Sequence, residues 1–326
     1  MKKIIPVLLL LNVITISAQN LTWTNVSGNY NMPIGVQVFS GEDANIPLKI
    51  KYIDIDLNIT DLELTPELST TPTNAKNWAT TLGAIAVMNG GYFGGSSSYS
   101  AVVNKTVEAK NMAILNRSGT DYPVTRGFFG FNSDGTMAVN WIYHFGNTKA
   151  DIYSYATPAP NGDATPAPAP TQAGGTQWTT LTKGMGAGPV LIKNGNIVNT
   201  YTEEVFWGSG VSNYDLEPRS SIGYTNNKHA ILLVVDGRQA GVSAGASLPQ
   251  VASILYGLGC VEALNCDGGG STQLATTGTF INTPSESYRS IPSVWAIYKK
   301  ANLETPNPIA PLDQSSTEVN PVTLKD

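Results

Sequence analysis

The segment HAILLVVDGRQAGVSAGASLPQVASILYGLGCVEALNCDGGGSTQL, residues 229–274, decides the fold of this chain. It contains two apolar runs, and each ends in an aspartate followed by glycine, Asp236 after residues 230–235 and Asp267 after residues 261–266. Short apolar runs bounded by glycine and polar residues predict buried strands. Polar side chains at the ends of buried strands are well placed to meet a ligand. We therefore expect both carboxylates to face one pocket.

A helix is expected between these two strands. Ser247 followed three residues later by Gln250 is the capping-box arrangement, and Pro249 suits a first helical turn. Apolar residues then recur at helical spacing, and Gly259 suits the C-terminal end. This helix returns the chain, so that the second strand lies near the first.

A triple-glycine loop follows Asp267. Alternation along the second strand puts Asn265 and Asp267 on the same face, next to this loop. Glycines leave the backbone amides bare, but they also cost folding entropy, so a binding role is favoured over a flexible turn. The binding candidates in the loop carry bare amides or hydroxyls: Gly268, Gly269, Gly270, Ser271 and Thr272.

The same pattern occurs earlier in the chain. Residues 84–88 form an apolar run, and Asn89, Gly90 and Gly91 follow it directly. Two adjacent glycines let backbone N–H groups approach an anion or a sugar closely. An ordinary glycine turn explains this pattern equally well when it is taken alone.

Three arginines are candidates for binding an anion. Arg219 precedes an expected strand, Arg238 follows the first aspartate, and Arg289 precedes the last expected strand. A guanidinium fork matches phosphate oxygens in pairs, whereas the alternative for Arg219 is a surface salt bridge. Three further acidic residues lie in loop sequence and receive no role: Glu203, Glu204 and Asp215.

Composition indicates a folded, β-rich protein. The chain has 326 residues, a net charge of −5, and charged residues at only 13%, so nucleic-acid binding has no basic stripe to support it. The 32 glycines favour many turns. We expect an α+β fold with mixed or largely antiparallel sheets and a few packed helices, in a single catalytic domain over residues 20–300. Strand-like runs lie at residues 34–39, 50–57, 126–131, 137–144, 184–192 and 293–298, and a helix is expected over residues 74–82.

The two ends of the chain carry different signals. Lys2, Lys3 and an apolar run over residues 4–16 predict a signal peptide over residues 1–19, hence a secreted, periplasmic or cell-envelope protein. This run is too short for a membrane span, so no span is expected after signal removal. Residues 301–326 are expected to form a polar tail, and the Pro/Ala-rich residues 156–175 an exposed loop.

The chain has two cysteines, Cys260 and Cys266. Export permits a disulfide, but both residues lie in the most apolar part of the chain. Buried free thiols are favoured over a bridge, and no metal-binding spacing is visible.

Five pieces of the sequence, in this order, resemble the phosphodiester glycosidase family: MNGGYF (88–93), GAGPVLIKNG (186–195), PRSSIGY (218–224), residues 234–272 and RSIPSVWAIY (289–298). The resemblance covers residues 85–298 and implies a hydrolase that cleaves a glycosyl phosphodiester in a glycan or exopolysaccharide. Two positions depart from the family pattern, with Cys266 in place of the usual leucine and Gln250 in place of a frequent acid. The insertion at residues 156–175 is peculiar to this chain.

The resemblance also implies a set of site residues, namely Asn89, Gly90, Gly91, Arg219, Asp236, Arg238, Asn265, Asp267, Gly268, Gly269, Gly270, Ser271 and Arg289. The leaving group of a sugar-1-phosphodiester is already a stable anion, so the site must hold negative charge and orient water. Asp267 or Asp236 is expected to be the general base or nucleophile. The remaining roles are a phosphate clamp and positioning of sugar or water: Arg219, Arg238 and Arg289 for the first, Asn89 and Asn265 for the second.

Three alternatives stay open. The chain could bind phosphorylated cell-envelope glycan without cleaving it, or it could be a phosphodiesterase that attacks phosphorus. Two neighbouring aspartates could also hold a divalent cation, although an arginine site without any cofactor is favoured. The expected partner in each case is a phosphorylated carbohydrate.

Overall fold

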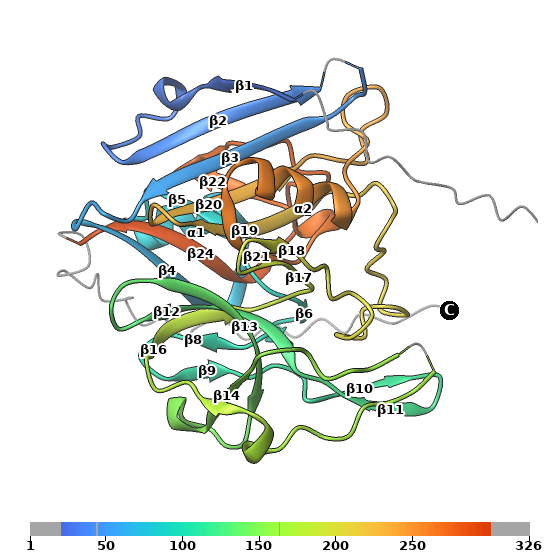
Figure 1. Cartoon of the computed structure of the whole chain (residues 1–326). Helices are drawn as coiled ribbons and strands as arrows, with labels where there is room; N and C mark the ends of the chain where they lie inside the picture. Colours follow the sequence, from blue (N-terminus) through green and yellow to red (C-terminus); the bar gives the residue numbers. More distant parts are fainter. Residues whose placement is uncertain (1–20, 44, 163, 301–326) are drawn as a thin grey trace, which may run out of the picture.

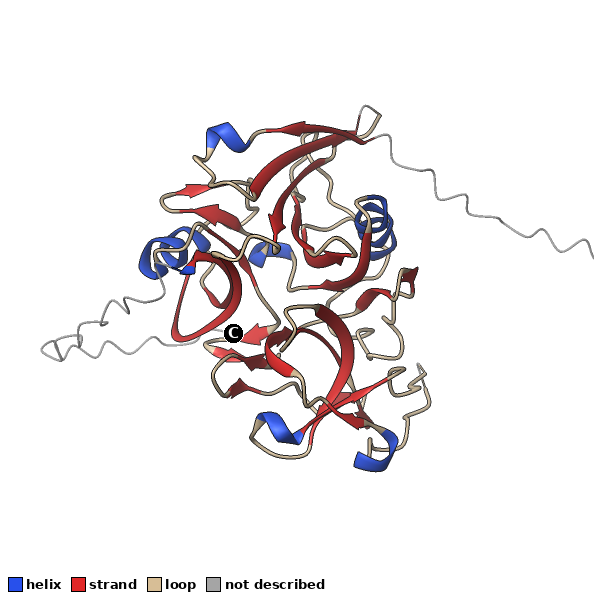
Figure 2. Cartoon of the chain, turned by 60° about the vertical axis from the view of Figure 1, so that its left-hand side comes forward, coloured by secondary structure: helices blue, strands red, loops and turns tan. Residues whose placement is uncertain are grey.

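The computed structural model describes residues 21–43, 45–162 and 164–300. The predicted signal peptide and polar tail lie outside the described residues. Three sheets of eight, seven and five strands make up most of the fold (Figures 1 and 2). The pairings of the described strands are antiparallel, as expected. Helices contribute so little that the α+β description fits only loosely (Figure 2).

The eight-stranded sheet contains the two strands predicted within residues 229–274. In spatial order its strands are β1 (Leu21–Asn25), β2 (Val36–Asp43), β3 (Lys49–Asp56), β20 (His229–Val235), β19 (Arg219–Thr225), β21 (Cys260–Asn265), β17 (Val190–Lys193) and β18 (Asn196–Ile197). The two apolar runs were expected to lie near each other, and they flank β19 on its two sides. Since both are antiparallel to β19, they run in the same direction and end at the same edge of the sheet.

Two smaller sheets and two hairpins complete the strands. The seven-stranded sheet, at the bottom of Figure 1, runs β15 (Thr176–Gln177), β14 (Ile152–Tyr155), β13 (Met137–His144), β12 (Arg126–Asn132), β16 (Leu181–Gly186), β8 (Val102–Val103) and β9 (Val107–Ala109). The five-stranded sheet runs β23 (Thr279–Phe280), β22 (Leu274–Thr276), β5 (Ala86–Asn89), β24 (Ile291–Lys299) and β4 (Leu62–Thr73). The hairpins are β6 (Phe93–Gly94) with β7 (Ser97–Ser98), and β10 (Ile114–Arg117) with β11 (Thr120–Pro123).

The two α-helices of the described residues begin where the sequence predicts. Asn74 caps α1 (Ala75–Leu82) by accepting a hydrogen bond from the backbone of Asn77. Ser247 and Gln250 form the expected capping box at the start of α2 (Leu248–Gly257). Short 3₁₀ turns occupy η1 (Ser27–Asn29), η2 (Lys149–Asp151), η3 (Gln172–Gly174) and η4 (Gly269–Ser271).

One apolar core joins the three sheets. It contains Ile53 and Leu232 of the eight-stranded sheet, Phe129 of the seven-stranded sheet, and Met88 and Trp295 of the five-stranded sheet. A second cluster packs α2 against the other face of the eight-stranded sheet. The shared core brings the end of β5 close to the place where β20 and β21 end and β19 begins.

One expected element is wrong. Residues 184–192 were expected to form a single strand, but they divide between β16 in the seven-stranded sheet and β17 in the eight-stranded sheet. The break falls at residues 187–189, where the backbone passes from one sheet to the other. Both halves are buried and apolar, so the pattern was interpreted as one strand, although Gly188-Pro189 at the break is a turn signal.

Two further predictions concern the cysteines and a membrane span. Cys260 and Cys266 are buried free thiols, as expected. Among the described residues, no helix has the length and apolar character needed to cross a membrane.

Candidate active site

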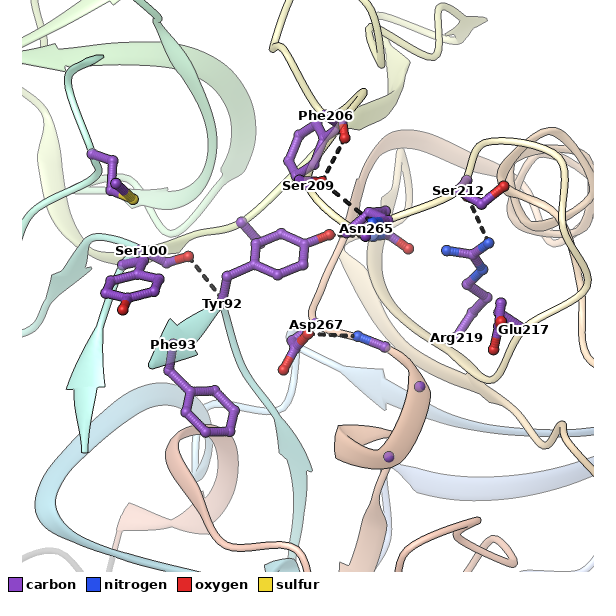
Figure 3. Close-up of a pocket in the computed structure, with 18 of the residues that line it drawn as sticks. Tyr92, Phe93, Ser100, Phe206, Ser209, Ser212, Glu217, Arg219, Asn265 and Asp267 are labelled. Atoms are coloured by element: carbon purple, nitrogen blue, oxygen red, sulfur yellow. Dashed lines mark hydrogen bonds between the residues drawn. The ribbon is translucent and has the colours of Figure 1, made fainter. Parts of the chain in front are cut away.

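A cavity of about 640 Å³ opens beside the shared edge of β20, β19 and β21. Its wall includes Tyr92, which follows β5, and Arg126, which begins β12. Arg219 at the start of β19, with Asn265 and Asp267 at the end of β21, lines it as well (Figure 3). Elements from three sheets therefore supply its polar groups.

Asp267 has a carboxylate that faces this cavity (Figure 3). Its Oδ1 accepts a 3.0 Å hydrogen bond from the backbone N–H of Gly268. Burial raises the pKa of the Asp267 carboxyl to about 6, while the Ser271 hydroxyl, the charge of Arg289 and the Gly268 amide act in the opposite direction. A carboxyl with a pKa near neutrality that faces a cavity is suited to accept a proton from water.

Arg289 lies next to this carboxylate. Its Nε donates a 3.1 Å hydrogen bond to Oγ of Ser271, the same hydroxyl that stabilises the charged form of Asp267. The guanidinium also lies over the ring of Phe93, 5.6 Å from its centre. Arg289 is about half-exposed at the cavity wall, so an anion in the cavity has access to it.

Arg238 and Arg289 share one carboxylate, that of Glu286. Nη1 of Arg238 lies 3.8 Å from Oε1 of Glu286, and Nη1 of Arg289 lies 3.4 Å from Oε2. Arg238 also donates a 2.7 Å hydrogen bond from Nε to Glu217. All four side chains line the cavity, so Arg238 and Arg289 are paired with carboxylates in this structure. Neither Glu217 nor Glu286 was identified from the sequence, because no local pattern marks them.

The triple-glycine loop makes room for these side chains. A Cβ on Gly270 would come within 2.3 Å of the Glu286 carboxylate, and a Cβ on Gly269 would lie 3.0 Å from Nη2 of Arg238. Gly268, Gly269 and Gly270 all line the cavity. The absence of side chains at Gly269 and Gly270 therefore lets Arg238 and Glu286 lie against the backbone. This close packing gives these two glycines a role beyond that of a flexible turn.

Arg219 is held by backbone carbonyls. It is only 3% exposed; its Nε donates to the carbonyl of Ala246 at 2.9 Å, and its Nη2 to those of Ser212 at 2.8 Å and Asp215 at 3.1 Å (Figure 3). Arg219 thus fixes two loops at the cavity wall. Only Nη1 makes no hydrogen bond to a described residue and is left for a ligand.

Asp236 does not line the cavity. Its carboxylate accepts hydrogen bonds from Nδ2 of Asn282 at 2.9 Å and from the backbone N–H of Thr283 at 3.1 Å. Burial raises its pKa to about 6, against the effect of these two donors and of Lys51. Thr272 is also buried behind the wall, and its carbonyl accepts a hydrogen bond from Asn282. The geometry gives both residues a role in holding the loop at residues 281–283.

Asn89 lies behind the cavity wall as well. It is 1% exposed, its Nδ2 donates a 2.7 Å hydrogen bond to the carbonyl of Asp267, and its Oδ1 accepts from Ser220 and Gln273. Gly90 accepts a 3.0 Å hydrogen bond from the N–H of Asp267. This arrangement makes Asn89 a positioning residue for the aspartate.

Packing accounts for the two glycines after Asn89. A Cβ on Gly90 would come within 2.4 Å of Sδ of Met185, and a Cβ on Gly91 would come within 2.4 Å of Ser100. Neither glycine lines the cavity. Close packing against β16 and its neighbours therefore explains this pair without a direct ligand contact.

Asn265 and Tyr92 form a polar pair that also lines the cavity. Nδ2 of Asn265 donates to the Tyr92 hydroxyl and to the carbonyl of Gly188, both at 3.0 Å, and Tyr92 donates to the same carbonyl at 2.8 Å. Oδ1 of Asn265 is buried without a partner among the described residues. Tyr92 belongs to the MNGGYF piece, but no role was predicted for it, because its partners are remote in the chain.

No group of three or more histidine, cysteine, aspartate or glutamate side chains in the described part of the chain is placed to hold a metal ion. The separation of Asp236 from the cavity also removes the pair of neighbouring aspartates on which the cation alternative depended.

Fold and cavity together define a β-rich protein with a carboxylate and arginines in one pocket. The family description "Phosphodiester glycosidase" matches residues 82–298, and the chain belongs to this family, as its sequence pieces indicated. A segment of 69 residues is 36% identical to the SPbeta prophage-derived uncharacterized protein YomE of Bacillus subtilis, spanning 21% of this chain and only 11% of YomE.

Two solved structures share the fold. One is the catalytic domain of zebrafish N-acetylglucosamine-1-phosphodiester alpha-N-acetylglucosaminidase, with a TM-score of 0.55 and 18% identity over 85% of this chain and 88% of that one. The other is a hypothetical protein from Synechocystis, with a TM-score of 0.55 and 20% identity over 81% of this chain and 62% of that one. At these identities the structures establish a common fold.

Proposed function

We propose that this protein is an exported hydrolase that cleaves the bond between a sugar and phosphate in a glycosyl phosphodiester. One observation carries the proposal: the Asp267 carboxylate faces a cavity that also exposes Arg238, Arg289 and the bare glycine loop. Family membership supports the phosphodiester glycosidase class. The zebrafish enzyme is named for a reaction of this class, on an N-acetylglucosamine phosphodiester.

The reaction proceeds by attack of water at the anomeric carbon. Asp267 accepts a proton from the water as the new C–O bond forms, and the bond between the anomeric carbon and the phosphate oxygen breaks. The phosphate monoester departs as an anion and needs no proton from the enzyme. A base with a pKa near the working pH is the most effective one, and the pKa of Asp267 is raised to about 6.

The negative charge of the leaving phosphate is stabilised by the arginine side of the cavity. Arg238 and Arg289 exchange Glu286 for phosphate oxygens, since a guanidinium binds two such oxygens side by side. In the glycine loop the N–H groups of Gly268 and Gly269 already donate to Asp267 and Pro218, so the amide of Gly270 is the one that adds a fixed dipole for the leaving phosphate. Asn265 and Tyr92 form the wall against which the sugar is oriented.

The substrate and the location of the protein are further parts of the proposal. A cavity of about 640 Å³ is in the size range of small-molecule sites and accommodates a sugar, its phosphate and part of the next unit. We assign the N-terminal lysines and the apolar run at residues 4–16 to export, which directs the enzyme to glycans or exopolysaccharide outside the cytoplasm.

Hydrolysis in oxygen-18 water tests the reaction. A glucose-1-phosphate methyl diester is incubated with the protein, and the products are examined by mass spectrometry. Label in the sugar hydroxyl is the expected result. Label in the phosphate would identify a phosphodiesterase that attacks phosphorus, and binding without product would identify a glycan-binding protein.

A further inference from the structure

Five arginines line the cavity: Arg117, Arg126, Arg219, Arg238 and Arg289. Four of them have acceptors. Arg117 donates to three backbone carbonyls and Arg219 to three others, while Arg238 and Arg289 are paired with carboxylates. No hydrogen bond or ion pair joins the Arg126 guanidinium to a described residue, and its Nη1 is buried without a partner there.

The surroundings of Arg126 keep it charged but do not satisfy its donors. The guanidinium lies over the ring of Phe206, 4.1 Å from its centre. Glu204 provides an opposing charge, yet the backbone N–H groups of Gly127 and Val190, with the side chains of Thr200 and Trp141, already occupy its oxygens. Burial lowers the pKa of Arg126 to about 10, with Glu204 acting against this effect, so it remains a cation at neutral pH.

Tyr92 is close both to the surroundings of Arg126 and to those of Asp267. The Tyr92 ring lies 5.4 Å from the ring of Phe206, on which Arg126 is placed. In Figure 3 Tyr92 lies between Phe206 and Asp267, and the charge of Asp267 acts on its hydroxyl. Tyr92, Arg126 and Asp267 all line the cavity, so a sugar whose anomeric carbon lies at Asp267 shares this cavity with the Arg126 guanidinium.

We propose that Arg126 is a second anion subsite, which binds a carboxylate on the sugar itself and selects glycosyl phosphodiesters of acidic sugars. This inference rests on the proposed function for the position of the sugar. Two features support a carboxylate as the ligand: a guanidinium fork matches its two oxygens, and the phosphate is already assigned to Arg238 and Arg289. The competing explanation is that Arg126 only offsets the charge of Glu204.

Binding is measured by isothermal titration in the Asp267→Asn variant, in which turnover is expected to be strongly reduced. The two probes are glucose-1-phosphate methyl diester and the matching glucuronic acid diester, which differ only at C6, a hydroxymethyl group in the first and a carboxylate in the second. We expect the glucuronic acid diester to bind about tenfold more tightly or better, and Arg126→Gln to remove this preference while leaving the neutral diester nearly unaffected. Equal affinity for the two probes, or a preference that survives Arg126→Gln, overturns the proposal.

The loss of a charge opposite Glu204 needs a control. Arg126→Gln leaves Glu204 without an opposing charge. The double variant Arg126→Gln with Glu204→Gln is therefore measured as well, because it keeps the pair neutral.

Arg117→Gln is the matched control for cavity charge. It removes a guanidinium from the same cavity, but the nitrogens of Arg117 already donate to backbone carbonyls, so the preference for the acidic diester should persist. Loss of the preference in Arg117→Gln would show a general charge effect and overturn the subsite.

Failure of the subsite and failure of the proposed function give different results. Wild-type hydrolysis of the neutral diester measures the function without involving Arg126. Hydrolysis without any preference for the acidic sugar rejects the subsite alone. An Arg126-dependent preference in binding without hydrolysis of either diester supports the subsite and rejects the function.

Discussion

The side-chain amide of Asn89 donates a 2.7 Å hydrogen bond to the backbone carbonyl of Asp267, a residue 178 positions later in the chain. The N–H of Asp267 in turn donates to the carbonyl of Gly90 at 3.0 Å. The loop after β5 therefore holds the proposed catalytic aspartate from behind. Because Asn89 makes no contact with the cavity, its substitution should separate positioning from catalysis.

Replacement of Asn89 by alanine should lower both stability and turnover. The change leaves buried donors and acceptors of Asp267, Ser220 and Gln273 unsatisfied, which should reduce the free energy of unfolding by about 3 kcal/mol. Urea denaturation measures this loss, and kinetics should show a lower kcat with little change in KM. Ser220→Ala, which removes one donor to Asn89, should have a smaller effect on both. Full turnover in Asn89→Ala would contradict the positioning role.

Replacement of Asp267 by asparagine should remove most of the activity. Loss of a general base typically costs a factor of about 10² to 10⁴, and we expect a fall in kcat in this range for the phosphodiester. Asp236→Asn is the matched control, since Asp236 is a buried carboxylate that contacts Asn282 and Thr283 behind the wall. It should reduce thermal stability and retain most of kcat. The reverse pattern would exchange the roles of the two aspartates.

The pH dependence of kcat/KM should report the carboxyl of Asp267. A general base works only when it is ionised, and a group with a pKa raised to about 6 is protonated below that pH. Activity should therefore fall by roughly tenfold per pH unit below about 6 and level off above it. Because the charge of Arg289 lowers the pKa of Asp267, Arg289→Gln should move this limb to higher pH. A limb at the same pH in wild type and Arg289→Gln would be inconsistent with this pairing.

Removal of Glu286 should improve substrate binding. Its carboxylate lies within 3.8 Å of Arg238 and 3.4 Å of Arg289, where the phosphate is proposed to bind. Half-exposed ion pairs contribute about 0–1 kcal/mol, so Glu286→Gln should lower KM by a few-fold at most. The fall in KM should be larger at low salt than at high salt, because salt screens exposed charges. Glu42→Gln, which removes a carboxylate from a surface pair with Lys49, is the control for net charge. An equal fall in KM in both variants would rule out a local effect of Glu286.

Chelation should leave the activity unchanged. The arginines and the glycine loop provide the positive charge that a divalent cation would otherwise supply. We expect the same kcat before and after treatment with EDTA, measured on the same diester. Activity that is lost in EDTA and restored by an added metal would return the cation to the mechanism.

Local physical chemistry explains the parts of the fold that were predicted correctly. The strands at residues 229–235 and 260–265 and the helix between them follow from apolar runs, a capping box and glycine at the helix end. The split of residues 184–192 between two sheets was missed, since two buried strands of different sheets carry the same apolar pattern as one.

The site was predicted in outline only. Asp267 and its glycines were identified, because a strand end followed by glycines is a local signal. Arg126, Glu204 and Glu286 were not, since each depends on partners from other segments: Arg126 on Phe206, Glu204 on the strands around it, and Glu286 on two arginines.

The amino-acid sequence by itself determined that two strands end in aspartate and glycine, and that a helix returns the chain between them. Tertiary structure alone decided that these strands flank β19 and that the two aspartates differ. Asp236 is covered by residues 282–283, whereas Asp267 faces the cavity and is held by Asn89. The physical reason is that a strand and its glycine turn are set by neighbours in the chain. The burial and hydrogen bonds of a carboxylate are set by segments that only packing brings to it.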